Sequence, residues 1–231
     1  RIRLFISSYL AKSGAKGGLV IGLSGGLDSA GCLELCAQAV GAKKVLGLAL
    51  PDKSTPRGDV SDALAHAEKL GVECIVADIT PVMESYAELL PEASDKVRGN
   101  LAARTRMAIL YYHAAVRGGL VVGTSDRSEV LVGYYTKWGD GGSDLMPIAG
   151  LYKTEVRELA RHHLRVPPEI AEKKSSPRLW QGQLAEDELG IDYATLDRIL
   201  HLRIDRKAGV REAARRLGVA PEQVRKVDSM V

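Results

Sequence analysis

The sequence lacks the features that mark several large classes of protein. No apolar run reaches the roughly 20 residues that a membrane-spanning helix needs, and no signal peptide opens the chain. The formal net charge is only +3, from 32 basic and 29 acidic residues, which is too mild to indicate nucleic-acid binding. We therefore expect a soluble, cytoplasmic protein that binds neither membrane nor nucleic acid, and whose slight positive charge suits anionic small substrates.

Cysteine is also scarce, and its spacing does not favour a cysteine-based metal centre. The chain has three cysteines, Cys32, Cys36 and Cys74. Cys32 and Cys36 share a helix face and could hold a metal, but no second pair accompanies them. We expect small buried thiols in a reducing compartment. The histidines show no zinc spacing, and His162 and His163 are interpreted as a solvated pair near a helix end.

The chain is organised around a glycine-rich turn that lacks the lysine of a Walker A loop. Residues 18–29 read GLVIGLSGGLDS, an apolar run followed by a turn and the start of a helix. The glycines at 22, 25 and 26 also fail to match the Rossmann fingerprint. Adjacent glycines allow close approach of a ligand to the backbone, and the helix behind them adds unpaired N–H donors. The turn therefore suits a phosphate or pyrophosphate.

An acidic residue, Asp28, stands where the lysine would be expected. Alone, this carboxylate would repel phosphate, but a divalent cation could bridge it to phosphate oxygens. The alternative is a simple glycine turn in which Asp28 caps the helix. The density of small residues favours the nucleotide-binding interpretation.

The rest of the chain alternates apolar runs with helical patterns. Strands are expected near residues 18–23, 44–50, 72–79 and 120–123. Helices are expected at 3–12 and 27–40, from the end of the loop at 52–59 to residue 70, and at 81–90 and 95–116. This alternation predicts an α/β fold: a doubly wound, mainly parallel five-stranded sheet with helices on both faces and a C-terminal helical extension. The polar loop at 52–59 lies at a strand's carboxyl end, where ligand loops are common.

The pattern changes after about residue 166. We expect a single domain over residues 1–231, with an α/β nucleotide-binding core at about 1–166 and a loop and helical extension at about 167–231. Residues 172–183 are polar and aperiodic. Residues 210–227 imitate a helix-turn-helix with Gly218 at the corner. Because their charges are mixed and no basic face is evident, we favour a helical appendage over a DNA-binding motif.

Several motifs then point to one family. SGGxDS at 24–29 resembles the loop of the ATP-pyrophosphatase superfamily, which splits ATP between its α and β phosphates. Residues 98–106 (RGNLAARTR), 123–129 (GTSDRSE), 133–144 (GYYTKWGDGGSD) and 151–153 (LYK) together resemble ammonia-dependent NAD synthetase. The resemblance extends from residue 24 to about residue 176.

The resemblance implies a two-step amidation. The carboxylate of deamido-NAD attacks the α-phosphate of ATP, and ammonia then displaces AMP to give NAD. It also implies Mg²⁺, a homodimer with deamido-NAD at the subunit interface, and free ammonia or a separate donor, because the chain leaves no room for a glutaminase domain. A C-terminal His-Lys pair of the family has no counterpart before Val231, and a proline-rich turn of the family is replaced by KKSSP at 173–177.

Residue roles follow from the resemblance position by position. ATP would contact Gly22, Leu23, Ser24, Gly25, Gly26, Leu27, Asp28, Ser29, Thr124, Lys153 and Ser176. Deamido-NAD would contact Arg104, Lys137 and Asp144. The Mg²⁺ ligands would be Asp28 and Glu129, and the catalytic residues Asp28, Lys153 and Asp144.

Each of these residues has a plainer interpretation when considered alone. Lys153 and Glu129 would be surface charges, one of Arg104 and Arg106 would face water, and Trp138 would pack in a core. Their joint spacing favours the functional interpretation for Asp28, Glu129, Lys137, Asp144 and Lys153. The competing functions are another ATP-pyrophosphatase enzyme, GMP-forming or tRNA-thiolating, and a nucleotide-switched nucleic-acid-binding protein. The thiolating enzyme would be expected to carry cysteines near the site.

Overall fold

A parallel sheet of four strands forms the centre of the molecule. The computed structural model describes residues 1–180 and 182–231. The sheet order is β3-β2-β1-β4, and all neighbouring strands are parallel. The strands are β1 (Leu19–Gly22), β2 (Val45–Ala49), β3 (Glu73–Val76) and β4 (Leu120–Val122). The chain steps outward from β1 to β3 and returns to the other side of β1 for β4. The carboxyl ends of β1 and β4 therefore meet where the winding reverses, the usual place for a ligand in such sheets.

The expected fifth strand was wrong for the part of the chain that the structure describes. After β4 the chain runs back beside the sheet but forms only one bridge, between Val122 and Leu145. The Gly123 amide donates to the Leu145 carbonyl at 2.9 Å. Pro147 follows two residues later and has no amide hydrogen with which to extend the ladder. The segment is therefore anchored to the sheet edge without becoming a strand.

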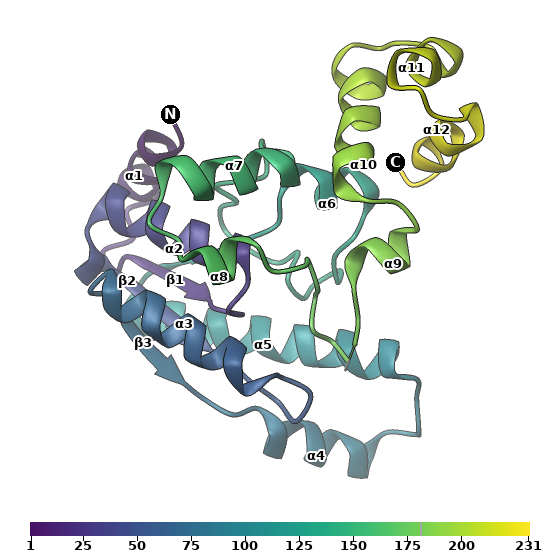
Figure 1. Ribbon diagram of the computed structural model, residues 1–231. Helices are drawn as coiled ribbons and strands as arrows, with labels where there is room; N and C mark the ends of the chain where they lie inside the picture. Colours follow the sequence, from purple (N-terminus) through teal and green to yellow (C-terminus); the bar gives the residue numbers. More distant parts are fainter. Residues whose placement is uncertain (181) are drawn as a thin grey trace.

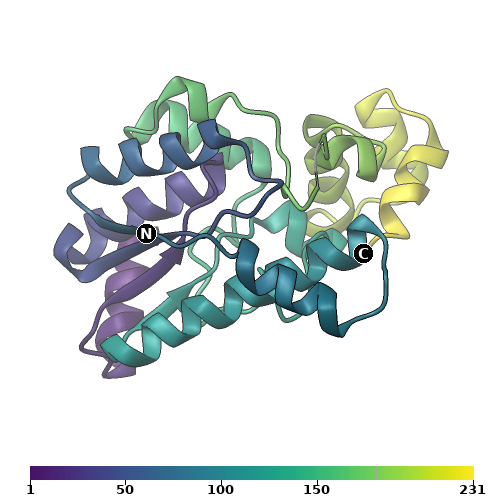
Figure 2. The same cartoon turned by 90° about the horizontal axis from the view of Figure 1, so that it is seen from below.

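Successive side chains of a strand point to opposite faces of the sheet, and apolar side chains on both faces explain why helices cover both. Leu19 and Ile21 of β1 enter one apolar cluster, and Val20 between them enters another. The first face is covered by α1 (Ile2–Ser13), α2 (Leu27–Val40), α3 (Arg57–Lys69), α7 (Lys153–His163) and α8 (Pro168–Ala171). The second is covered by α4 (Thr80–Leu89) and α5 (Asp95–Arg117). Figures 1 and 2 show the long α5 crossing beneath the sheet.

The C-terminal helices form a group with an apolar core of its own. They are α9 (Ala185–Leu189), α10 (Tyr193–Leu200), a π-helical turn (His201–Asp205), α11 (Val210–Leu217) and α12 (Pro221–Asp228). Leu196 of α10 packs in one cluster with Ala213 of α11 and Val224 of α12. Gly218 ends α11 with a φ of 69°, in the left-handed region. The two helices thus pack on α10 as an appendage does, at one end of the molecule (Figure 1).

Two short elements complete the described chain. A 3-10 turn (Ala42–Lys44) precedes β2, and α6 (Arg127–Val132) follows β4. α6 joins the two parts, because its Leu131 and Val132 pack against the C-terminal cluster. Within the described residues, no helix has the length and apolar character needed to cross a bilayer.

Candidate active site

The glycine-rich turn after β1 holds its own shape through two serines. The hydroxyls of Ser24 and Ser29 lie 3.1 Å apart, and the amide of Gly26 donates to the Ser24 hydroxyl at 3.2 Å. The Ser29 hydroxyl also donates to the Gly26 carbonyl at 3.1 Å. α2 begins at Leu27, so its first amides lie directly behind the turn. The predicted strand, turn and helix start are confirmed.

Gly25 allows this turn to pack against α3. Its φ is 72°, and a Cβ atom built there would stand only 2.1 Å from the Asp59 carbonyl oxygen. Neither feature is tolerated by a residue with a side chain. On the other side, the Lys173 ammonium donates to the Gly25 carbonyl at 2.9 Å and to the carboxylates of Asp59 at 2.8 Å and Asp62 at 2.6 Å. The turn is therefore held between α3 and the segment that follows α8.

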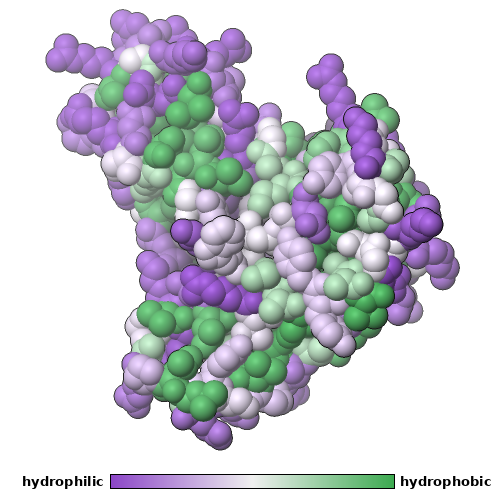
Figure 3. Space-filling model, turned by 180° about the vertical axis from the view of Figure 1, so that it is seen from behind, coloured by the Kyte–Doolittle hydropathy of each residue, from purple (hydrophilic) through white to green (hydrophobic). Residues whose placement is uncertain are grey.

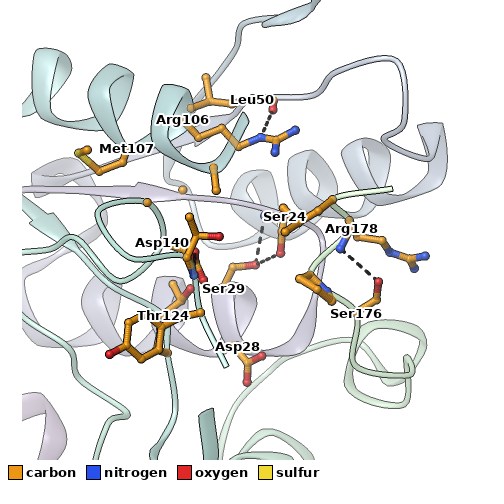
Figure 4. A pocket seen from close by; sticks show the side chains of 18 of the residues that line it. Ser24, Asp28, Ser29, Leu50, Arg106, Met107, Thr124, Asp140, Ser176 and Arg178 are labelled. Atoms are coloured by element: carbon orange, nitrogen blue, oxygen red, sulfur yellow. Dashed lines mark hydrogen bonds between the residues drawn. The ribbon is translucent and has the colours of Figure 1, made fainter. Parts of the chain in front are cut away.

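A pocket of about 450 Å³ opens above the turn at the carboxyl ends of β1, β2 and β4. Eight predicted site residues line it: Gly22, Leu23, Ser24, Asp28, Ser29, Thr124, Glu129 and Ser176. In Figure 4, Ser24, Ser29 and Asp28 lie on one wall, with Ser176 and Arg178 beside them. The Ser176 hydroxyl donates to the Gln183 carbonyl at 2.6 Å. Gly25, Gly26 and Leu27 stand in the turn itself, outside the lining.

Lys153 is fully buried and lies at the centre of three carboxylates. Its ammonium is 2.7 Å from Asp28, 2.9 Å from Asp126 and 2.8 Å from Glu129. A lone surface lysine, the plainer interpretation of the sequence, is thus wrong. Removing one partner from a buried ion pair typically costs about 3–5 kcal/mol, so these four side chains hold one another in place.

The four groups carry an excess of negative charge when all are ionised, since three carboxylates surround one ammonium. Burial, with the neighbouring carboxylates Asp126 and Asp28, raises the pKa of Glu129 to about 8 despite Lys153. Burial likewise raises the pKa of Asp126 to about 6. Burial alone would lower the pKa of Lys153, but the three carboxylates outweigh it and raise that pKa well above its usual value. The lysine therefore stays charged, and the excess charge suits an added cation.

The residues present fit a divalent cation on the pocket side of this cluster. The second oxygen of Asp28, Oδ1, is buried and has no hydrogen-bond partner. Asp28 and Glu129 both line the pocket and share Lys153. The described residues contain no group of three or more His, Cys, Asp and Glu side chains that could hold a metal alone. A magnesium ion here would take its remaining oxygen ligands from phosphates and water.

Asp126 is a site residue that sequence reasoning missed, although it lies within the GTSD motif. It caps α6: its carboxylate accepts the Glu129 amide at 2.9 Å, while Glu129 accepts the Asp126 amide at 3.2 Å. This reciprocal capping box fixes Glu129 at the first turn of the helix. The D-x-x-E spacing of a capping box was the available signal.

Arg106 is a second missed residue. Its guanidinium donates to the Leu50 carbonyl at 2.8 Å and to Asp52 at 2.8 Å, and it lines the pocket (Figure 4). Of the two arginines on this helix, Arg104 is the one that faces water. This agrees with the expectation that one of the pair would be solvated.

The three residues assigned to deamido-NAD lie outside this pocket. Arg104 is exposed on α5 and donates to the Lys137 carbonyl at 3.1 Å. The Lys137 ammonium stands over the exposed ring of Trp138, 5.5 Å from its centroid. Asp144 accepts the Val121 amide at 2.7 Å and the Tyr111 hydroxyl at 3.3 Å, so it fixes the return segment to β4. The structure brings Arg104 and Lys137 together and holds Asp144 at the sheet edge.

Comparison with known proteins gives one consistent family. The family model described as NAD synthase matches residues 1–231. An NH₃-dependent NAD⁺ synthetase of Hyperthermus butylicus is 51% identical over 98% of this chain and 82% of its own length. The enzyme of the same name from Thermococcus kodakarensis is 47% identical over 100% of this chain and 89% of its own.

Solved structures agree with the sequence comparisons. An NMN synthetase from Francisella tularensis superposes with a TM-score of 0.86 and 32% identity, covering 99% of this chain and 89% of its own. An NH₃-dependent NAD synthetase from Campylobacter jejuni gives a TM-score of 0.83 and 28% identity, with 99% and 89% coverage. The pocket, the buried acid–lysine cluster and these matches lead to one conclusion: the chain belongs to the NAD synthase family.

Proposed function

We propose that this protein converts deamido-NAD to NAD with ATP and ammonia, releasing AMP and pyrophosphate in the last step of NAD biosynthesis. The observation that carries this proposal is the unpartnered oxygen of Asp28, placed in a pocket beside a turn suited to phosphate. The sequence relatives named above carry out their reaction with ammonia, as their names state. The same family membership and the free thiols Cys32, Cys36 and Cys74 support a cytoplasmic location.

The chemistry requires two bond exchanges and no covalent enzyme intermediate. First, a carboxylate oxygen of deamido-NAD bonds to the α-phosphorus of ATP, and the bond to the bridging oxygen breaks to release pyrophosphate. Ammonia nitrogen then bonds to the acyl carbon, AMP leaves with the electron pair, and the nitrogen gives up a proton. The protein must hold two anions together and offset their charge.

The residues in and behind the pocket would have different roles in this reaction. The amides after Ser24 and the start of α2 would bind the triphosphate, and Thr124 and Ser176 would line the nucleotide's path. Lys153, which pairs with both Asp28 and Glu129 from behind, would hold the two carboxylates in a fixed orientation at the pocket. Those two acids would hold Mg²⁺, which supplies charge neutralisation of the phosphates when bound.

A homodimer would complete the site for the second substrate. On α5, Arg104, Ala108, Tyr112 and Val116 are spaced by four residues and are all exposed, so they share one stripe of the helix. Tyr112 is 68% and Val116 71% exposed, unusual values for apolar side chains. Figure 3 shows apolar side chains gathered in patches on the face opposite to Figure 1. We infer that this stripe meets a second copy and that Arg104 and Lys137 bind deamido-NAD at that interface.

Product analysis tests the reaction. The purified protein is incubated with ATP, MgCl₂, deamido-NAD and ammonium, and NAD and AMP are quantified. We expect equal amounts of both, and a loss of roughly 100-fold or more in Asp28→Asn. Glu222→Gln is the matched control. It removes an exposed carboxylate of α12 that does not line the pocket, so it should retain full activity.

Three other outcomes would change the proposal. AMP without NAD would indicate the same ATP chemistry acting on another carboxylate. A clear preference for nicotinate mononucleotide over deamido-NAD would place this chain with its NMN synthetase neighbour. ADP as product would refute the assignment of the glycine-rich turn.

A further inference from the structure

The C-terminal helices reach the acid–lysine cluster through one buried carboxylate. Asp197 of α10 is only 4% exposed. Its Oδ1 accepts the Ser128 hydroxyl at 2.5 Å, and its Oδ2 accepts the Thr154 amide at 2.8 Å. The Ser128 hydroxyl in turn accepts the Lys153 amide at 3.0 Å. One side chain thus joins three elements: α6, α7 and α10.

This network supplies the partners that the start of α7 needs. The first amides of a helix have no acceptor within the helix, and burying them unpaired is costly. Lys153 and Thr154 are the first two residues of α7, and their amides go to Ser128 and Asp197. A carboxylate at a helix N-terminus also interacts favourably with the helix dipole. Asp197 therefore fixes the backbone from which the Lys153 side chain extends.

The same network fixes Glu129. Ser128 precedes Glu129 in α6, so the bond from its hydroxyl to Asp197 restrains the first turn of that helix. The anchoring helix is itself rigidly held, because Leu196, Ile199 and Leu200 next to Asp197 are completely buried. The acid's position is therefore set by the core of the C-terminal helices.

Tyr193, one turn before Asp197 on α10, makes a second contact with the cluster. Its ring is fully buried, and the Lys153 ammonium lies 5.2 Å from the ring centroid. Residues four apart on a helix share a face. One face of α10 thus contacts the Lys153 ammonium directly through Tyr193, and reaches the Lys153 amide indirectly through Asp197 and Ser128.

We propose that Asp197 is a positioning residue for the ATP-dependent step: through Ser128 and Thr154 it holds Lys153 and Glu129 in their working geometry. The proposal rests on the proposed function, and it assigns to the C-terminal helices a part in the reaction rather than in stability alone. Asp197 itself is not among the residues that line the pocket.

The test compares Asp197→Ala, Asp197→Asn and a matched control, Asp228→Asn. The control breaks the Asp228 pair with Arg203, 2.8 Å apart, within the same helical group but away from Asp197. We expect Asp197→Ala to lower kcat roughly 10- to 100-fold with little change in KM for ATP, since displacing reacting groups by about 1 Å has effects of that size. Asn keeps one acceptor and the side-chain shape, so it should recover part of kcat. The control should match wild type.

Backbone amide exchange gives a readout that does not depend on turnover. In Asp197→Ala, the amides of residues 153–154 should exchange much faster than in wild type or in Asp228→Asn, with melting of the whole protein monitored in parallel. Unchanged exchange at these amides would overturn the proposal, as would a kcat equal to wild type in an active enzyme. If Asp197→Ala does not fold, Asp197→Asn and Ser128→Ala carry the same comparison. If wild type makes no NAD, the proposed function fails, and the exchange result alone decides the role of Asp197.

Discussion

At the scale of single residues, the pair formed by Arg106 and Asp52 fixes the pocket wall at the end of β2. Asp52 accepts hydrogen bonds from the amide of Ser54 at 2.9 Å and its hydroxyl at 2.7 Å, besides the ion pair with Arg106. Its side chain is only 13% exposed. Burial raises the pKa of Asp52, but the bonds from Ser54 and the charge of Arg106 outweigh burial and lower that pKa below its usual value.

This lowered pKa predicts a pH-dependent contribution to stability. Because the folded state favours the ionised form, the contribution is complete above the unfolded pKa of about 4 and is lost as pH falls through the lower folded value. Asp52→Asn should therefore reduce the free energy of unfolding by about 1–3 kcal/mol at pH 7, and by less at pH 3. Urea denaturation at both pH values measures this.

The control for this experiment is Asp95→Asn. Asp95 pairs with Arg98 at 2.5 Å, but both side chains are largely exposed, and such pairs contribute about 0–1 kcal/mol. An equal loss of stability in the two variants at pH 7, or a loss in Asp52→Asn that does not change with pH, would contradict the prediction.

The burial of Lys153 could not be predicted from the residues next to it in the sequence. The motif containing Lys153 pointed to a site, yet the residue's own neighbours suggested a solvated lysine. Its environment depends on Asp28 from α2 and on Asp126 and Glu129 from the turn and helix after β4, which meet only in the folded sheet. Local spacing could identify the capping pair of Asp126 and Glu129. It could not show that Lys153 also contacts Asp28, which lies 125 positions away in the sequence.

At the scale of elements, Lys173 ties the segment after α8 to the glycine-rich turn. Its ammonium contacts Gly25 of the turn and both Asp59 and Asp62 of α3, and its side chain is 21% exposed. The same segment carries Ser176, a predicted ATP contact. Lys173 thus offsets two carboxylates of α3 beside the glycine-rich turn, where we propose that the triphosphate binds.

Removing this charge should weaken ATP binding. We expect Lys173→Met to raise KM for ATP roughly 10-fold, because Asp62 loses its ion pair and Asp59 keeps only the one with Arg178, 3.0 Å away, beside the glycine-rich turn. Lys174→Met removes the same charge from the next residue, which is exposed, and should behave as wild type. Steady-state kinetics with varied ATP distinguish the two. Equal effects in both variants would show that only the overall charge matters.

The elements were predictable to different degrees for physical reasons. Buried parallel strands are short apolar runs between turn residues, so all four strands were anticipated near their observed positions. The count of five strands was wrong: single hydrogen bonds and Pro147 decide whether an edge segment becomes a strand. The C-terminal helices were predicted, but their link to the active site through Asp197 was not, since a buried carboxylate on an amphipathic helix resembles a surface acid in the sequence.

At the scale of the whole molecule, an exposed stripe on α5 connects the proposed deamido-NAD residues to the proposed subunit interface. The stripe begins at Arg104 and ends at Val116. Exposed aromatic side chains also lie on α1, where the rings of Phe5 and Tyr9 are tilted against each other with centroids 5.8 Å apart. Burial of Tyr9, Tyr112 and Val116 between two copies would remove exposed apolar surface from water. The second copy would then shape the deamido-NAD site that the ATP pocket alone does not provide.

Val116→Asp tests this arrangement, because a charge at the end of the stripe would be buried unpaired in the dimer. We expect wild type to be dimeric by light scattering and the variant to be monomeric at the same concentration. Its KM for deamido-NAD should rise at least 10-fold, as expected for an interface site losing about 1.4 kcal/mol or more, while ATP binding changes little. Leu89→Asp, at an apolar side chain of α4 that is 80% exposed, is the control. Dissociation by Leu89→Asp alone would indicate that the interface lies on α4. A dimeric Val116→Asp with unchanged KM would show that the α5 stripe contributes neither to the dimer interface nor to the deamido-NAD site. A monomeric Val116→Asp with an unchanged KM would place the deamido-NAD site within a single copy of the chain.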